Sequence, residues 1–412
     1  MFRKFTLAVC LLALLAACNG QSATPTSTVA PTQLPTETPY PAATATLEKE
    51  TANLAPTATR GPTGTPIPTL PPQDVGPDNF PADANPLTGL IVTDTALLER
   101  RPVSVKVNIV PRGTTRPAWG LSQADIVYDY YHNDGYARFH AIFYGTDVPL
   151  VGPVRSGRLP DVELVRMYKS IFAYGSADQR INSRLFNSEF SNRLVLESGE
   201  SNCPPTNENP LCRYDPNGYK HLLGGTNAIR AYAVSHGSDN VRQNLNGMLF
   251  GVAQPSSGAA GSQVITYYSI DNYLKWEYDP ASGRYLRFQD AVTVSGPGNE
   301  VYEPLLDRLT DKQIAADNVV VLVVPHTYFA PPPGDIVEIL LSGVGKAYAF
   351  RDGQAYEVTW NRPTVDSVLY LTFADGTRYP FKPGNTWFQV VSTNSKVAQP
   401  GDGLWRYDFV MP

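Results

Sequence analysis

The sequence lacks the residues and motifs that mark most enzyme classes. Its 412 residues include only five histidines and four cysteines, and no CxxC pair occurs. It also lacks a GxSxG nucleophile turn, an HExxH zinc motif, a P-loop and a dinucleotide fingerprint. The stretch Gly152–Gly157 does not match the nucleophile turn, because the residue two positions before Ser156 is not glycine. The common hydrolase, kinase and dehydrogenase patterns are therefore excluded, and we expect no cofactor and no metal ion.

An excess of positive charge is missing as well. The formal net charge is −5 and the pI is about 5.6, so the chain has no general attraction for polyanions and we expect no nucleic-acid partner. Tyrosine is abundant, with 23 residues. Its ring suits half-buried sheet faces, and it equally suits sugar or peptide binding. The length is sufficient to bury a large hydrophobic core.

The N-terminus has the features of a targeting signal. Arg3 and Lys4 precede an apolar run over residues 5–17, which is too short to span a bilayer. The run ends in Leu15–Cys18, which resembles a bacterial lipobox. That resemblance implies a signal peptide over residues 1–17 and a lipid on the sulfur of Cys18. We therefore predict a protein anchored by lipid to the extracytoplasmic face of the cell membrane; the alternative is an ordinary secretory signal.

A segment rich in threonine and proline follows the signal. Residues 21–75 contain 14 Thr and 11 Pro and almost no aromatic side chains. Such a composition cannot bury enough apolar surface to offset the entropy of ordering the chain. We predict that residues 18–79 form a disordered linker that separates the folded part from the lipid, with or without glycans on its threonines.

We predict that the ordered part of the chain begins near Asn85, and the pattern of apolar residues after it predicts a strand-rich fold. Two apolar runs, 126–131 and 138–144, flank the turn Asn133–Gly135 and predict a hairpin. Pro160 followed by an acidic residue predicts a helix start, and the apolar run 318–324 predicts a strand buried on both faces. Further strands are predicted at 101–110, 264–270, 273–278, 284–288, 336–341, 346–350, 354–360, 368–373 and 387–391, and further helices at 179–190, at 226–234 with Thr226 as the cap, and at 303–314. We predict an α+β fold of mainly antiparallel or mixed sheets, with helices packed on one face, behind a disordered N-terminal stalk.

Two sets of motifs resemble the YerB-like family of bacterial lipoproteins. The N-terminal set is Asn85–Gly89, Arg101–Val103, Gly120–Tyr128, Arg138–Phe139 and Gly152–Ser156, and the C-terminal set is Gly343–Ala347, Trp360, Pro380 and Pro383–Trp387. The resemblance implies an envelope lipoprotein of undefined activity, with an N-terminal α+β domain over residues 80–255 and a β-rich C-terminal domain over residues 256–412. It brings no catalytic residue. The chain departs from the family pattern at 171–176, which lacks a histidine and paired glycines, and at 288–292, which lacks the histidine of a histidine–aspartate pair.

The strongest candidate site is the basic turn before the Pro160 helix. Arg155, Ser156 and Arg158 lie where free backbone N–H groups, the positive end of a helix dipole and two guanidinium groups favour an anion such as phosphate or carboxylate. The alternative is that the arginines pair with nearby acids and only stabilise the turn: Asp161, Glu163 or Asp178.

The histidines offer weaker candidates. His132, Asp134 and His140 flank one hairpin, but their spacing matches no metal motif. His221, with Asp178, is the best candidate for acid–base chemistry. The alternative is a loop histidine that makes a single hydrogen bond.

Two cysteines and four tryptophans offer further structural predictions. Cys203 and Cys212 are close in sequence, and outside the cell such a pair is most simply a disulfide that holds a long loop. Four tryptophans suit either glycan stacking or a sheet core: Trp276, Trp360, Trp387 and Trp405.

These observations lead to three hypotheses about function. The first is an envelope lipoprotein of undefined activity that binds an anionic wall component through the Arg155–Arg158 turn. The second is a wall hydrolase that uses His221 and nearby carboxylates, and the third is a module for binding envelope proteins.

Overall fold

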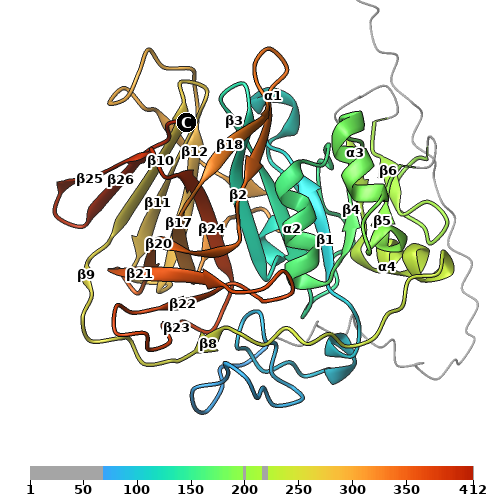
Figure 1. Cartoon of the computed structure of the whole chain (residues 1–412), viewed down its shortest axis with the longest axis horizontal. Helices are drawn as coiled ribbons and strands as arrows, with labels where there is room; N and C mark the ends of the chain where they lie inside the picture. The colour runs from blue at the N-terminus through green and yellow to red at the C-terminus, as the bar shows by residue number, and fades with distance from the viewer. Residues whose placement is uncertain (1–67, 198–200, 216–220, 412) are drawn as a thin grey trace, which may run out of the picture. The chain divides into compact units, whose positions relative to one another are not determined.

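The computed structural model describes residues 68–197, 201–215 and 221–411, so the predicted signal peptide, the predicted lipidation site Cys18 and most of the predicted linker lie outside the described residues. The fold is α+β, and strands supply most of its regular structure (Figure 1). The α-helices are short: α1 Arg112–Thr115, α2 Leu159–Tyr168, α3 Gln179–Phe186 and α4 Thr226–Ser235. Three 3-10 turns accompany them: η1 Thr95–Leu98, η2 Leu121–Gln123 and η3 Ser191–Arg193.

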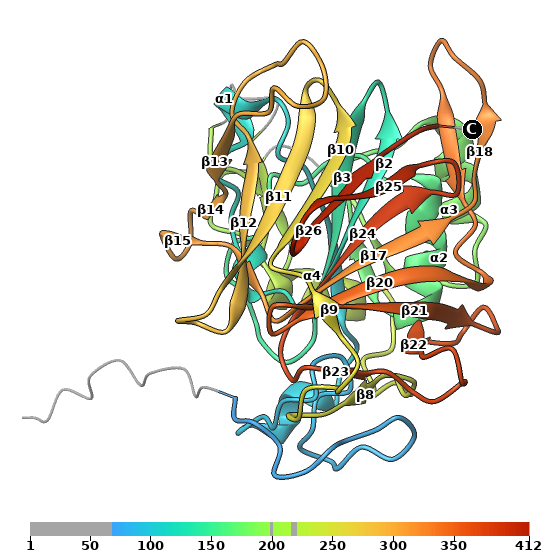
Figure 2. The ribbon, with the colours of Figure 1, turned by 90° about the vertical axis from the view of Figure 1, so that its left-hand side faces the viewer.

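A large mixed sheet combines strands from both halves of the sequence. Its order is β22-β21-β20-β17-β24-β2-β3-β1-β4-β5, with β9 paired to β21. The strands are β22 Tyr370–Thr372, β21 Gln354–Arg362, β20 Gly343–Arg351, β17 Asn318–Val324, β24 Thr386–Ser392, β2 Ile126–Asn133, β3 Tyr136–Phe143, β1 Val103–Val107, β4 Ile171–Ala173, β5 Leu194–Val195 and β9 Ala259–Ala260. Strand β24 is parallel to both β17 and β2, so it joins the two halves (Figure 2).

A second sheet packs against the first. Its order is β13-β12-β11-β10-β26-β25, with β16 paired to β12. The strands are β13 Tyr302–Pro304, β12 Arg284–Asp290, β11 Asn272–Asp279, β10 Gln263–Ser269, β26 Leu404–Asp408, β25 Lys396–Gly401 and β16 Ala315–Ala316. The ring of Trp276 on β11 lies 5.2 Å from that of Trp387 on β24, and Phe139 on β3 lies 5.3 Å from Trp387. The larger hydrophobic core therefore includes side chains between the two sheets, and a second cluster packs α2 against α3.

Four short strand pairs complete the structure. They are β14 Leu306–Asp307 with β15 Lys312–Gln313, β18 His326–Ala330 with β19 Ile336–Ile339, β8 Leu249–Phe250 with β23 Pro380–Phe381, and β6 Leu211–Arg213 with β7 Leu222–Gly224.

Several sequence predictions are confirmed. The hairpin β2–β3 turns at Asp134 and Gly135, which both have positive φ, as a tight two-residue turn requires. Helix α2 contains Pro160 in its first turn, and β17 is almost entirely buried. The four tryptophans for which the sequence left open a sheet core or glycan stacking are all buried in the core.

The predicted helix over 303–314 is wrong. The segment forms β13, β14 and β15 because tertiary contacts outweigh its helical pattern. The carboxylate of Asp307 accepts hydrogen bonds from the N–H groups of Gly120 and Ser122, at 2.9 and 2.7 Å. Asp311 also adopts a left-handed conformation, with φ of 54°, that a helix excludes.

Two further predictions need correction. Thr226 does not cap α4, because Gly225 occupies the N-cap position and the Thr226 hydroxyl accepts a hydrogen bond from the Val148 N–H instead, at 2.8 Å. The ordered contacts also begin before Asn85. Val75 is buried and exchanges backbone hydrogen bonds of 2.9 Å with Phe250.

Candidate functional site

One face of the β1–β2–β3 layer carries buried polar side chains. In the strand register, Lys106 on β1 pairs with His140 on β3, and Tyr130 on β2 pairs with Arg138 on β3. Because side chains alternate between the two faces of a strand, these four residues share one face. Lys106, Tyr130 and His140 are fully buried, and all three contact Asp161 of α2.

Asp161 is the centre of this buried network. Its Oδ1 accepts a hydrogen bond from the Tyr130 hydroxyl and lies 2.8 Å from His140 Nδ1 and 3.4 Å from Lys106 Nζ. Its Oδ2 accepts the backbone N–H of Arg158 at 2.6 Å, which closes a capping box at the start of α2. Burial alone would raise the pKa of Asp161, but the Lys106 ammonium and the His140 hydrogen bond hold that pKa well below its usual range.

The closed capping box changes the predicted anion site. The predicted site needs free backbone N–H groups at the helix start, but the Arg158 N–H bonds to Asp161 and Pro160 has no N–H. The positive charge comes instead from side chains. Lys106 contributes less of this charge than an exposed lysine would, because burial lowers its pKa to about 7 against the opposing charge of Asp161.

Two guanidinium groups lie over this network. Arg138 Nη1 donates to the Ser156 carbonyl at 3.1 Å, and Arg158 Nη1 donates to the Gly157 carbonyl at 2.9 Å. Arg158 Nη2 lies 3.5 Å from His132 Nδ1. Among the described residues, no carboxylate lies within 4 Å of the guanidinium of Arg138 or Arg158. Burial, then repulsion from Arg158 and Arg155, lowers the pKa of Arg138 to about 9. We call Arg138, Arg155, Ser156 and Arg158 the arginine site.

Of the three acids proposed as partners for the turn, one bonds the turn backbone and two pair with arginines outside the turn. Asp161 bonds the Arg158 backbone, Glu163 pairs with Arg166 and Arg362, and Asp178 pairs with Arg180 while it caps α3. Arg155 lies between β1 and the turn after β4. Its N–H donates to the Lys106 carbonyl at 2.9 Å, and its carbonyl accepts from Gly175 at 3.0 Å.

The residues that sequence reasoning missed are Arg138, Lys106 and Tyr130. They come from three strands and meet only through the sheet order, so a linear motif could not find them. One signal was available: Arg138 and His140 alternate on β3 with the apolar Phe139 and Ala141, which marks a polar face on a buried strand.

The histidine candidates do not gather in one place. His132 contacts Arg158, whereas His140 contacts Asp161. In residues 68–197, 201–215 and 221–411, no group of three or more His, Cys, Asp or Glu could hold a metal ion. His221 Nδ1 lies 3.3 Å from Asp215 and its ring stacks on Tyr214. No contact joins His221 to Asp178 in the described part of the chain.

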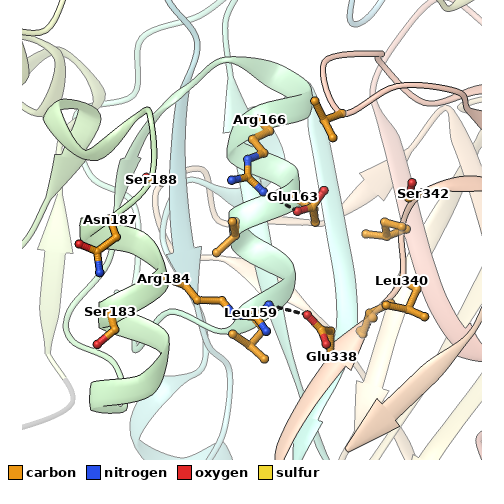
Figure 3. A pocket seen from close by; sticks show the side chains of 14 residues that line it. Leu159, Glu163, Arg166, Ser183, Arg184, Asn187, Ser188, Glu338, Leu340 and Ser342 are labelled. Atoms are coloured by element: carbon orange, nitrogen blue, oxygen red, sulfur yellow. Dashed lines mark hydrogen bonds and ion pairs between the residues drawn. The ribbon is translucent and has the colours of Figure 1, made fainter. Parts of the chain in front are cut away.

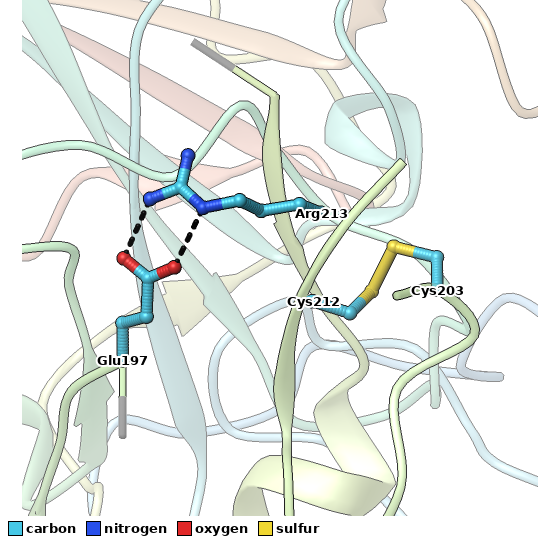
Figure 4. Close-up of a disulfide and its surroundings, with 4 residues drawn as sticks. All are labelled: Glu197, Cys203, Cys212 and Arg213. Carbon is cyan, nitrogen blue, oxygen red and sulfur yellow. Dashed lines mark hydrogen bonds and ion pairs between the residues drawn. A yellow bond between two sulfur atoms is a disulfide. The ribbon is translucent and has the colours of Figure 1, made fainter. Parts of the chain in front are cut away.

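The predicted disulfide is present. Cys203 and Cys212 are bonded, with Cα atoms 4.9 Å apart (Figure 4). Beside the disulfide, Arg213 makes a two-bond ion pair with Glu197, each bond 2.8 Å long. Cys212 is fully buried and packs with Trp119 and Leu223.

A separate groove of 650 Å³ runs over the outer side of α2, between α3 and the segment 338–342 (Figure 3). Its floor includes Leu159 and Val162. Its charged groups are paired with one another: Arg184 with Glu338, and Arg166 with Glu163 and Glu189. The groove therefore offers no surplus charge, unlike the arginine site.

The motifs at Asn85, Asp125 and Asn385 meet in one junction between the two sequence halves. Asn85 Nδ2 donates to Asp125 Oδ1 at 2.8 Å, and the Asp125 carbonyl accepts from Thr386 N at 3.1 Å. Asn385 N donates to Asp317 Oδ2 at 3.1 Å. These contacts give the motif residues a structural role at the junction.

Both halves of the chain match a known protein family. Residues 87–206 match the N-terminal domain of a protein family of unknown function, DUF3048, and residues 264–388 match its C-terminal domain. The two matches together cover more than half of the chain. The chain belongs to the DUF3048 family. The two DUF3048 regions contribute neighbouring strands to the same large sheet.

A relative of this DUF3048 protein has a solved structure. YerB from Bacillus subtilis (strain 168), a protein named as a lipoprotein, is 29% identical over 329 residues, which cover 77% of this chain and 89% of the relative. The crystal structure of the YerB protein matches with a TM-score of 0.60 at 27% identity, over 75% of this chain and 96% of that chain. Similarity to YerB indicates an envelope lipoprotein whose function is not known. Within the described residues, no helix is long and apolar enough to cross a membrane.

Proposed function

We propose that this DUF3048 protein is a lipid-anchored protein of the extracytoplasmic membrane face that binds an anionic wall component at the arginine site. The anchor is Cys18, and the residues that contact the anion are Arg138 and Arg158, with Arg155 and Ser156 beside them. The partner is a wall polymer that carries phosphate or carboxylate groups, and no cofactor takes part.

The observation that supports binding is the unpartnered Nε of Arg138. Its Nη1 is used by the Ser156 carbonyl, whereas its Nε is buried and has no hydrogen-bond partner among the described residues. A buried donor without a partner costs free energy, and the Nε–Nη2 edge of a guanidinium is the geometry that accepts two oxygens of one carboxylate or phosphate. The nearby charge of Arg158 adds to the attraction.

The direct test is retention on purified wall fragments. We expect wild-type protein to be retained, and we expect Arg138→Gln to lose about tenfold in affinity because a charge-assisted bond is removed. Retention should fall as salt rises, since salt screens the long-range attraction between the positive site and the anionic wall polymer. Arg242→Gln is the matched control, because Arg242 is a surface arginine already paired with Glu99 at 2.8 Å.

The outcomes separate the three hypotheses about function. Equal retention of wild type and Arg138→Gln would remove the arginine site from the proposal. Release of soluble products from the fragments would instead indicate a wall hydrolase. Absence of both retention and products would favour a protein partner.

The anchor is tested separately. Cys18→Ser should move the protein from the membrane fraction to the medium, because one apolar run of this length does not hold a mature protein on a bilayer. A Cys10→Ser variant is the matched control, since Cys10 lies within the predicted signal peptide and its removal should leave the protein on the membrane. Continued membrane retention of Cys18→Ser would contradict the lipid anchor.

A further inference from the structure

Carboxylates border the arginine site on the side of the β2–β3 turn. Arg158 contacts His132, and Asp134 follows His132 by two residues at the exposed tip of the hairpin. Asn133 Nδ2 donates to Asp134 Oδ2 at 2.9 Å and fixes that carboxylate at the tip. Burial lowers the pKa of Arg158, and the charge of Asp134 opposes that shift, although the two groups form no ion pair.

A second carboxylate approaches from the β18–β19 hairpin. Asp335 precedes Ile336, and the Ile336 side chain packs in one cluster with Leu159, the residue after Arg158. Asp335 is only 9% exposed. Burial and the charge of Asp134 raise the pKa of Asp335, and the charge of Arg158 opposes them. In the part of the chain that the structure describes, neither Asp134 nor Asp335 has a lysine or arginine nitrogen within 4 Å.

The charges thus form two adjacent groups of opposite sign. Arg138 and Arg158 make the positive group, and the Nε of Arg138 is buried without a hydrogen-bond partner among the described residues. Asp134 and Asp335 make the negative group beside it. A purely anionic ligand gains from the first group and is repelled by the second, so the arrangement discriminates by charge pattern rather than by charge alone.

We propose that the arginine site takes a zwitterionic ligand: a phosphate or carboxylate on Arg138 and Arg158, with an ammonium on the neighbouring carbons facing Asp134 and Asp335. This inference rests on the proposed function and narrows its ligand to amine-bearing oxyanions. The ammonium of the ligand would supply Asp134 and Asp335 with the cationic partner that neither has among the described residues.

Three small probes separate the two charges of the ligand. Inorganic phosphate supplies the anion alone, phosphoethanolamine supplies the anion with the ammonium, and N-acetyl-phosphoethanolamine keeps the chain but removes the positive charge. By calorimetry on the folded protein, we expect phosphoethanolamine to bind about tenfold more tightly than its N-acetyl form, since a hydrogen bond between charged groups is gained. Asp335→Asn should remove that preference and leave the N-acetyl probe bound at least as tightly. Arg138→Gln should weaken both probes.

Each outcome decides a different claim. Equal affinity of wild type for the two ethanolamine probes overturns the zwitterion inference and leaves the anion site intact. A preference that survives in the Asp134→Asn/Asp335→Asn double variant also overturns it. If wild type binds none of the three probes, the proposed function fails and the inference fails with it. The wild-type comparison needs no substitution, so it holds even if a variant folds poorly.

Discussion

At the scale of single residues, Asp161 determines the charge of the site. It balances Lys106, bonds Tyr130 and closes the start of α2 through the Arg158 N–H. A carboxylate committed to these contacts cannot also pair with a guanidinium. The positive charges of Arg138 and Arg158 are therefore left over, which is the physical basis for an anion at this position.

Lys106 should make stability depend on pH. Burial lowers its pKa to about 7 in the folded protein, whereas the unfolded value is 10.5. Between these values the unfolded chain binds a proton that the folded chain does not, so the free energy of unfolding rises as pH rises above 7. Relative to Lys106→Met, wild type should gain up to ~1.4 kcal/mol per pH unit. Urea denaturation of both proteins at pH 6, 7, 8 and 9 measures this difference.

The groups that face Lys106 set the control for that experiment: Tyr130 on β2, Arg138 and His140 on β3, Asp161 on α2 and Arg158 at the N-cap of α2. All of them remain in Lys106→Met, so their own titrations largely cancel in the comparison. A difference between the two proteins that stays constant from pH 6 to 9 would mean that Lys106 keeps an ordinary pKa.

At the scale of elements, the sequence predicts those strands and helices whose formation depends on neighbouring residues in the chain. The β2–β3 hairpin follows from its Asp134-Gly135 turn, and α2 follows from Pro160 and its acidic first turn. The segment 303–314 fails because its apolar spacing also suits short strands, and the Asp307 carboxylate is recruited by Gly120, far away in sequence. Such a contact has no local signature.

The sequence also predicts only part of the candidate site. Arg155, Ser156 and Arg158 are contiguous, so the sequence identifies them as a basic turn. Arg138 joins them only because β3 lies next to β1 and β2 in the sheet. Hydrophobic alternation predicts which side chains of a strand face the core, but it does not predict the order of the strands in the sheet. That order places Arg138 beside the basic turn.

The loop held by the Cys203–Cys212 disulfide gives a prediction at this scale. Cys203→Ser/Cys212→Ser should lose about 2–3 kcal/mol of unfolding free energy, because the closed loop no longer restricts the unfolded chain. Limited proteolysis should then cut within residues 201–215 faster than in wild type. Glu197→Gln, which removes only the partly exposed ion pair to Arg213, should lose less than about 1 kcal/mol. If the double serine variant matched wild type in both measurements, the disulfide would have no stabilising role.

At the scale of the whole molecule, the two sheets are joined by a buried ion pair. Arg287 on β12 donates to Asp129 on β2 at 2.8 Å, and both side chains are almost completely buried. The guanidinium also lies 5.2 Å from the Trp387 ring and bonds Gln289 at 2.7 Å. Because β2 carries Tyr130 on its opposite face, this pair also fixes the strand that supports the arginine site.

Removal of one partner should therefore destabilise the whole unit. Arg287→Met leaves the Asp129 carboxylate buried without a counter-charge and should cost about 3–5 kcal/mol in urea denaturation. Burial already raises the pKa of Asp129, and loss of Arg287 removes the largest opposing charge, so the carboxyl should protonate more readily. The deficit should thus be smaller at pH 4 than at pH 7. Arg287→Met/Asp129→Leu should recover much of the loss, because no charge is then buried. If the double variant had the same free energy of unfolding as Arg287→Met, the loss would come from packing of the Arg287 side chain and not from the uncompensated charge of Asp129.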